Sequence, residues 1–274
     1  MGEYLNKEKI CNLLNSIKSL PNSFALKGKK GSGKHLLLDF INKKFFKEDY
    51  LDITDKINEE SLNEIYLYNN KRLYVINTSN LNLKDQNILL KFIEEPYSNI
   101  YVCLLIENEN NILDTVKNRL IIYEIPPYNK EELKLFCNKE KILLEDKYID
   151  YLIYTPGDIL DIRSKNIDLN KVEELALKMV LKLEEASFPN TLSIIGKINF
   201  KDEFDKIDLD FLLRFLYLNY FEFFKKENNN IYFECLQIVS KYNKILSNNN
   251  NNKPKVFSLL LSELWEVNHG IKGI

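Results

Sequence analysis

The chain has 274 residues, of which 45% are hydrophobic and 28% charged, and its formal net charge is −2. This composition is typical of an ordinary globular protein with a sizeable core, and the near-neutral charge argues against a general polyanion binder, so any contact with DNA would have to be local or shared. The polar start MGEYLNKEKI lacks a signal-peptide core, and no apolar run approaches the ~20 residues that span a bilayer, which predicts a cytoplasmic protein with no membrane contact.

The first 126 residues alternate short apolar segments with amphipathic ones. The pattern predicts helices before Pro21 and at 36–41, 59–68, 84–95 and 112–118, and strands at 23–26, 50–53, 73–76, 101–106 and 121–125. Strands that alternate with helices favour parallel pairing, with helices on both faces of the sheet. We therefore expect an α/β domain with a parallel sheet over residues 1–126.

The pattern changes after Pro126-Pro127, where strand signals end. Short helices are predicted at 130–139, 146–154 and 157–164, which gives a small helical lid over residues 127–167. Longer helices rich in aromatic residues then predict an all-α domain over residues 168–274. Its aromatic and leucine side chains at helical spacing are expected to be core residues: Phe211, Leu212, Phe215, Leu216, Tyr220 and Phe224.

The four cysteines stand apart from one another, at positions 11, 103, 137 and 235. The chain has no CxxC pair of the kind that zinc ribbons use. Buried thiols are the ordinary interpretation of such isolated cysteines. No zinc site is predicted.

A glycine-rich loop follows the first predicted strand and opens a helix, which is the context of a phosphate-binding loop. Its glycines let several N–H groups converge on phosphate oxygens, and a lysine reaches the terminal phosphates. The candidate binding residues are Gly28, Lys29, Lys30, Gly31, Ser32, Gly33, Lys34 and His35. The alternative interpretation is a glycine-rich turn that binds no nucleotide.

The groups that would hold a metal are missing at the expected positions. His35 stands where such loops carry Ser or Thr, and a neutral imidazole is a poor ligand for Mg²⁺. The apolar strand at 73–76 runs into Asn77 and Thr78, which cannot supply the carboxylates that hold the metal and orient water. Glu94, on the next helix, is interpreted as a solvated or interface charge. The sequence predicts no metal site and no hydrolysis centre.

Three segments after this loop resemble bacterial clamp-loader ATPases of the AAA+ family. They are QNILLKFIEEP at 86–96, YVCLLIEN at 101–108 and ILDTVKNR at 112–119, in the family's order and spacing. The resemblance implies an AAA+ P-loop domain, a helical lid and an α-helical collar through which subunits assemble.

The departures from ATP-hydrolysing members identify the subunit type that the chain resembles. Besides His35 and the Asn77-Thr78 pair, Ile106 replaces the polar residue of the first sensor and Leu160 the arginine of the second. This combination is similar to the delta-prime type of DNA polymerase III subunit. The resemblance implies a subunit that is no enzyme on its own, and that binds ATP or ADP, if at all, without hydrolysis.

The same resemblance implies partners and one catalytic group. The partners would be ATP-hydrolysing motor subunits, a clamp-opening subunit, the sliding clamp and, indirectly, primed DNA. Arg119 matches the arginine of the family's Ser-Arg-Cys motif, which acts in trans as an arginine finger on a neighbour's nucleotide. The alternative for Arg119 is a surface arginine favoured by a helix end.

Two other functions stay open at this point. The chain could be an autonomous P-loop ATPase whose acidic residues have diverged. It could also be an assembly or adaptor protein, unrelated to replication, on the same fold.

Overall fold

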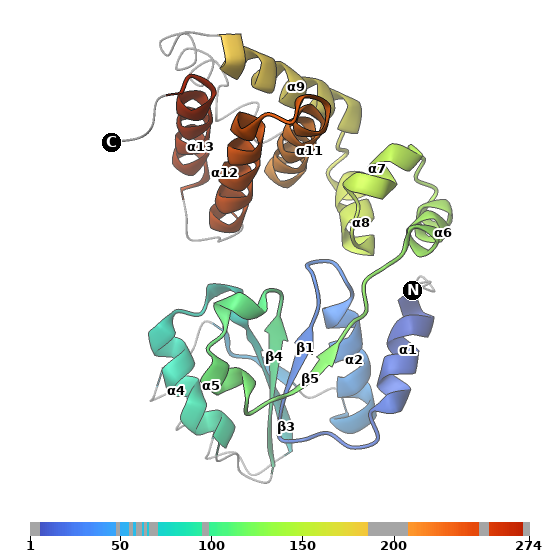
Figure 1. The fold of residues 1–274 in the computed structure, drawn as a ribbon. Helices are drawn as coiled ribbons and strands as arrows, with labels where there is room; N and C mark the ends of the chain where they lie inside the picture. Colours follow the sequence, from blue (N-terminus) through green and yellow to red (C-terminus); the bar gives the residue numbers. More distant parts are fainter. Residues whose placement is uncertain are drawn as a thin grey trace. The chain divides into compact units, whose positions relative to one another are not determined.

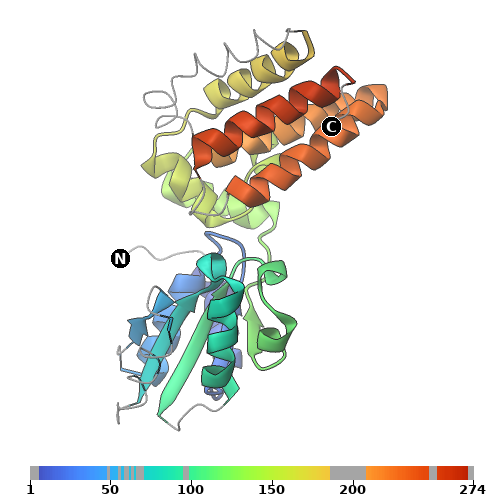
Figure 2. The ribbon, with the colours of Figure 1, turned by 90° about the vertical axis from the view of Figure 1, so that its left-hand side faces the viewer.

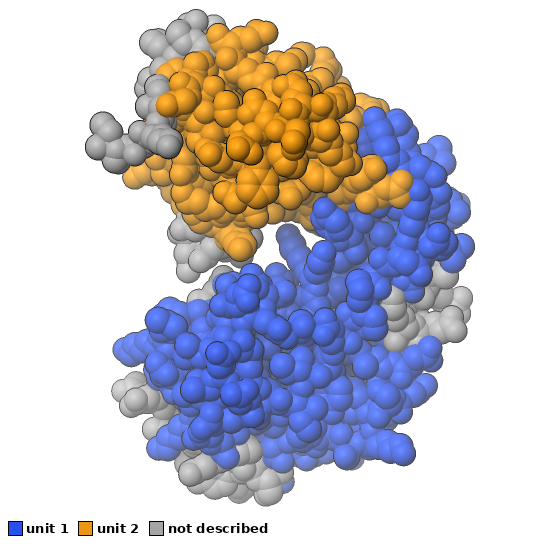
Figure 3. Space-filling model, in the orientation of Figure 1, with its two compact units in different colours: residues 1–149, 153–159 blue, residues 150–152, 160–274 orange. Residues whose placement is uncertain are grey.

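The structure is a computed structural model that describes residues 6–47, 50–54, 57–58, 62, 65, 71–94, 99–185, 208–246 and 252–270. The chain divides into two compact units (Figure 3). The first comprises residues 1–149 and 153–159, and the second comprises residues 150–152 and 160–274. The expected boundaries at 126/127 and 167/168 stay predictions.

The first unit is built on one five-stranded sheet (Figure 1). Every strand pair is parallel, and the strand order is β2-β3-β4-β1-β5. The strands are β1 (Ser23–Lys27), β2 (Tyr50–Asp52), β3 (Arg72–Asn77), β4 (Ile100–Ile106) and β5 (Ile121–Glu124). The predicted parallel α/β sheet is confirmed.

Helices cover both faces of this sheet, as Figure 1 shows. The helices on one side are α1 (Asn6–Ser16) and α2 (Lys34–Phe45), and those on the other are α4 (Leu83–Glu94) and α5 (Asp114–Lys117). Most of the helix predicted at 59–68 lies outside the described residues. Leu62 and Ile65 are described, and both are buried.

The helix predicted at 112–118 is shorter in the structure. Asn108 caps a 3-10 turn (η3, Glu109–Asn111) by accepting a hydrogen bond from the backbone N–H of Asn110. Ile112 and Leu113 then have extended backbone, so α5 begins only at Asp114. Capping by a short polar side chain stabilises the turn at the expense of a longer helix.

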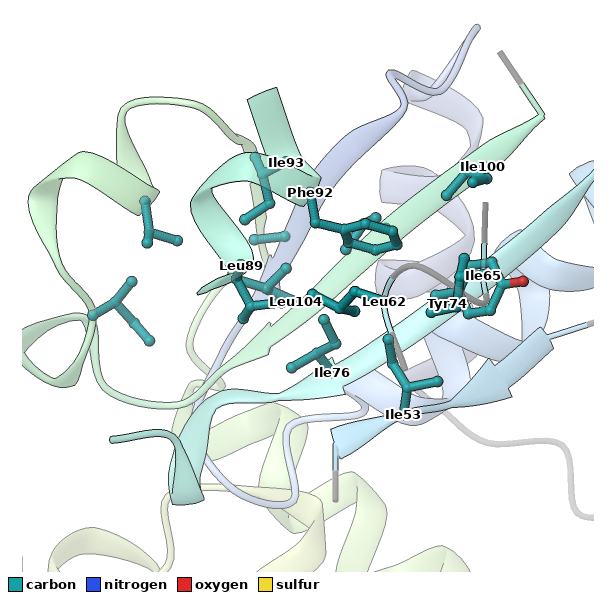
Figure 4. Close-up of a cluster of buried hydrophobic side chains, with 14 of the residues drawn as sticks. Ile53, Leu62, Ile65, Tyr74, Ile76, Leu89, Phe92, Ile93, Ile100 and Leu104 are labelled. Carbon is teal, nitrogen blue, oxygen red and sulfur yellow. The ribbon is translucent and has the colours of Figure 1, made fainter. Parts of the chain in front are cut away.

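Successive side chains of each strand point to opposite faces of the sheet, so they contribute to two separate hydrophobic cores. Tyr74 and Ile76 of β3 and Leu104 of β4 face α4, where Phe92 and Leu89 pack against them (Figure 4). Residues of opposite parity face α1 and α2 and are equally buried, among them Phe24, Leu26, Leu73, Val75, Cys103 and Leu105. A strand buried on both faces reads as a continuous apolar run, which is why these segments were recognisable.

The three helices after the sheet are α6 (Lys130–Glu140), α7 (Asp146–Tyr151) and α8 (Pro156–Ser164). A reciprocal capping box between Asn129 and Glu132 starts α6. The helix predicted at 146–154 ends instead at Tyr151, because the carboxylate of Asp158 accepts hydrogen bonds from the N–H groups of Tyr154 and Thr155. That carboxylate holds the turn before α8 in a non-helical form.

The remaining described elements of the second unit are all helices. The helices are α9 (Leu169–Glu185), α11 (Leu209–Glu227), α12 (Asn230–Leu246) and α13 (Lys253–Asn268), and each packs against two of the others (Figure 2). The predicted aromatic core is confirmed by the burial of Phe211, Phe215 and Tyr220, whereas Phe224 is only half-buried.

The cysteines behave largely as predicted. Cys103, Cys137 and Cys235 are buried free thiols, and Cys11 is half-buried. Burial raises the pKa of the Cys235 thiol to about 12, so it is protonated at neutral pH. Among the helices that the structure describes, none is long and apolar enough to cross a bilayer.

Truncating a buried leucine side chain in the second unit should destabilise that unit. Leu216 on α11 is fully buried, so we expect Leu216→Ala to lower the free energy of unfolding by about 2–5 kcal/mol. Leu177→Ala on α9, where the side chain is 39% exposed, should change it by less than about 1 kcal/mol. The fluorescence of Trp265, the chain's single tryptophan, reports urea unfolding of this unit. Equal losses in the two variants would contradict the assigned packing.

Candidate functional site

The predicted phosphate loop connects β1 to α2 in the structure. Gly31 and Gly33 have φ angles of 74° and 100°, in the left-handed region that glycine adopts without strain. The N–H of Gly28 donates to the carbonyl of Ile106 at 3.0 Å, which fixes the start of the loop beside the end of β4. The loop therefore stands at the carboxyl edge of the sheet.

Five consecutive carbonyl oxygens of this loop accept hydrogen bonds from the protein itself. Lys34 Nζ donates to Gly28 at 2.7 Å and to Lys29 at 3.0 Å. The carbonyl of Lys30 accepts from Thr155 Oγ1 at 3.0 Å, and that of Gly31 accepts from the N–H of Gly157 at 3.1 Å. The carbonyl of Ser32 accepts from the hydroxyl of Tyr128 at 2.7 Å. These bonds hold the carbonyl side of the loop in place.

The donor side of the loop suits an anion. A helix leaves its first N–H groups without partners inside the helix, and α2 begins at Lys34, directly after the glycines. The hydroxyl of Ser32 is buried and has no partner in the described part of the chain. Converging N–H groups, a buried hydroxyl and the positive end of a helix can together bind phosphate oxygens.

Lys34 carries the positive charge of the loop. Its side chain is 5% exposed, and burial lowers the pKa of its ammonium group. Glu107 opposes this shift, because its carboxylate lies 3.2 Å from Lys34 Nζ. The interpretation of the sequence missed Glu107, although it directly follows β4, which lies beside β1 in the sheet.

The start of α8 and the residues just before it contact the loop closely. A Cβ atom added to Gly157 would lie 2.3 Å from the Cα atom of Gly31, and one added to Gly31 would lie 2.6 Å from the Cα atom of Gly157. The ammonium group of Lys29 lies over the ring of Tyr154, 4.4 Å from its centroid. The backbone of residues 154–158 therefore packs directly against the predicted phosphate loop.

The residues expected at the metal position offer no carboxylate. His35 is exposed at the start of α2. Asn77 accepts a hydrogen bond from the N–H of Ser79, and Thr78 is buried with its hydroxyl donating to Leu105. Within the described ranges, no group of three or more His, Cys, Asp or Glu side chains could hold a metal ion.

Arg119 follows α5 and is 39% exposed. Its Nε forms an ion pair with the carboxylate of Glu94 at the end of α4, and its Nη1 donates to the carbonyl of Thr115 at 2.7 Å. Glu94, interpreted from the sequence as a solvated or interface charge, is 41% exposed and pairs with Arg119 because α4 and α5 pack side by side.

The structure places Arg119 and the loop at opposite edges of the sheet. Arg119 precedes β5 by two residues, and Ile121 at the start of β5 pairs with Phe24 near the start of β1. The loop begins after Lys27, at the other end of β1. Gly28 lies four positions after Phe24, and four steps along a strand span about 13 Å at ~3.3 Å per residue. The sequence predicted both features but not this separation.

A parallel sheet with a phosphate loop after its first strand, followed by helical regions, is the architecture of AAA+ P-loop proteins. A solved structure of this architecture is the DNA polymerase III gamma subunit-related protein of Thermotoga maritima. It has a TM-score of 0.50 and 15% sequence identity, and the match covers 97% of this chain and 100% of that one. The predicted AAA+ fold class is confirmed.

Sequence comparisons identify the kind of subunit that the chain resembles. A family model described as "DNA polymerase III, delta subunit" matches residues 47–129, a range that contains α4 and Arg119. DNA polymerase III subunit delta' of Buchnera aphidicola subsp. Schizaphis graminum is 26% identical, over 80% of this chain and 73% of that protein. The resemblance to the delta-prime subunit of the bacterial clamp loader is confirmed.

Protein Ycf2 of Physcomitrium patens is a further relative in sequence. It is 22% identical over a match that covers 95% of this chain. The chain spans 13% of the length of Ycf2.

The contact between the loop and residue 157 should be sensitive to a single methyl group. We expect Gly157→Ala to part the two backbones at a cost of about 1–3 kcal/mol, because neither Cα atom belongs to a flexible side chain. Amide hydrogen exchange should then be faster at residues 28–33 and at the N–H of residue 157, which donates to Gly31. Ser164→Ala, at the other end of α8, is the control. Equal protection in both variants would refute the close contact.

Proposed function

We propose that the chain is a non-catalytic, delta-prime-like clamp-loader subunit of DNA polymerase III, acting in DNA replication. The similarity to subunit delta' over 80% of the chain supports the class of protein. The position of Arg119 carries the mechanism. An exposed arginine at the amino edge of the sheet lies far from the chain's own phosphate loop, so its guanidinium is available to a neighbouring subunit.

Arg119 would act in trans as an arginine finger. In phosphoryl transfer, charge builds up on the oxygens of the transferred group, and a guanidinium beside them stabilises the transition state. The group suits this task because it is planar and permanently charged. In the part of the chain that the structure describes, Arg119 Nη2 has no hydrogen-bond partner, which leaves that nitrogen available for a phosphate.

The loop would hold the phosphates of ATP or ADP without hydrolysing them. The residues fit the group, since N–H donors, the buried hydroxyl of Ser32 and the ammonium of Lys34 are collected there. A bound phosphate would compete with Glu107 for Lys34. Without a carboxylate at Asn77 or Thr78, these residues offer no support for metal-assisted attack by water.

The remaining roles follow from the class of protein. The helices of residues 168–274 would form the collar that joins ATP-hydrolysing motor subunits and a clamp-opening subunit in the cytoplasm. The assembly would place the sliding clamp on primed DNA, which this chain would contact only indirectly. An adaptor function outside replication is the alternative if no such subunits associate with the chain.

One observation favours a second candidate, an autonomous ATPase with displaced acidic residues. The carboxylate of Glu107 lies at the carboxyl edge of the sheet, 3.2 Å from Lys34 Nζ. A carboxylate at such a place could orient an attacking water. Its present ion pair with Lys34 argues against that role, because the pair engages both charges.

Nucleotide binding by the purified chain should be independent of magnesium. We expect the dissociation constant of ADP to change by less than about threefold on adding Mg²⁺, since the residues at the metal position supply no carboxylate. Lys34→Ala should weaken binding at least about tenfold, because a hydrogen bond from a charged group contributes about 1.5–3 kcal/mol. Titration calorimetry measures both, with Lys178→Ala on the exposed face of α9 as the control. ATP turnover that Lys34→Ala abolishes would establish the autonomous ATPase instead.

Removal of the finger should slow ATP hydrolysis by the reconstituted complex. Arg119→Ala is expected to lower kcat about 10³-fold or more at the site that it serves, the range known for arginine fingers. Arg119→Lys should remain impaired, because a point charge lacks the planar fork of donors. Lys117→Ala removes a nearby positive charge that pairs with Asp114 at 2.7 Å and should leave the rate unchanged. An undiminished rate in Arg119→Ala, with assembly verified by gel filtration, would exclude the finger.

A further inference from the structure

Helix α4 fixes the segment that leads to Arg119. Gln86 is 2% exposed, and its amide group makes two hydrogen bonds to that segment. Its Nε2 donates to the carbonyl of Asn111 at 2.9 Å, and its Oε1 accepts from the N–H of Leu113 at 2.8 Å. Both polar atoms of a buried amide are thus satisfied by backbone just before α5, which makes this attachment specific and costly to break.

Glu94 makes a second attachment, eight residues further along the same helix. Its carboxylate pairs with Nε of Arg119, while the carbonyl of Thr115 accepts from Nη1. Eight residues of α-helix span about 12 Å. The start of the 111–119 segment and the arginine at its end are therefore both attached to one rigid helix.

The segment needs this support. Helix α5 has only four residues, and a single helical turn is not stable by itself in water. Its described apolar anchor is Val116, which is 1% exposed. A long side chain at the end of such a turn would otherwise sample many rotamers. The two contacts on Arg119 restrict that freedom and, among the residues that the structure describes, leave Nη2 without a partner.

We propose that Glu94 is a positioning residue for Arg119, aiming the guanidinium toward the nucleotide of a neighbouring subunit, with Gln86 fixing the register of the segment. This inference rests on the proposed function of Arg119. Glu94 does not touch the reacting phosphate and acts only through the arginine. It explains why a glutamine and a glutamate eight residues apart on α4 both face the 111–119 segment.

The test compares variants in the reconstituted clamp-loader complex, using steady-state ATP hydrolysis. Glu94→Ala should lower kcat on the order of tenfold, because misplacing a catalytic group by about 1 Å can cost up to 10²-fold. The KM for ATP should not change, since the nucleotide is bound by the neighbour. Glu94→Gln keeps an acceptor oxygen at the same reach, so it should restore the rate to within about threefold of the parent.

A double variant separates positioning from a general effect on folding. Residues that act through one another have non-additive effects, so Glu94→Ala should cause no further loss when Arg119 is already alanine. Glu222→Ala is the matched control, because Glu222 is 43% exposed and pairs with Lys225 at 3.4 Å on α11. It should leave kcat unchanged in either background.

The outcomes distinguish the two proposals. If Arg119→Ala slows hydrolysis but Glu94→Ala does not, the positioning role is wrong and the finger stands. A loss from Glu94→Ala that persists in the Arg119→Ala background also overturns the positioning role. If Arg119→Ala has no effect, the proposed function itself fails, and this inference fails with it.

Discussion

The parallel pairing of all five strands is the constraint on which both candidate sites depend. Parallel strands place every amino end at one edge of the sheet and every carboxyl end at the other. The phosphate loop follows the end of β1, whereas Arg119 precedes the start of β5. The glycine-rich loop and Arg119 therefore lie at opposite edges of the sheet.

Features coded by local sequence were predictable, and features coded by contacts across the fold were not. Continuous apolar runs predicted the strands, and the glycine spacing predicted the loop. The ion pairs of Glu107 and Glu94 depend on which strands and helices become neighbours, and a single sequence does not give that order. The predicted helix ends were wrong where a polar side chain, such as that of Asp158, accepts a hydrogen bond from the backbone.

The loop has structural partners that do not depend on nucleotide. Its carbonyl oxygens accept bonds from Lys34, Thr155, Gly157 and Tyr128, so the segment stays folded through the chain's own donors. Burial raises the pKa of Tyr128, which keeps its hydroxyl protonated as a donor. The sequence GKKGSGK therefore has a structural role that needs no bound nucleotide, because it joins the sheet to the start of α8.

The Gly31–Gly157 contact has a consequence for how this chain can vary. Each glycine occupies the space that a side chain on the other would need, and the backbones approach too closely for either to gain a methyl group without moving. The two positions are 126 residues apart in the sequence, yet neither can take a larger residue unless the whole turn shifts. In an alignment of related chains, glycine at one position should therefore accompany glycine at the other. Chains with both glycines are those expected to keep this close backbone contact.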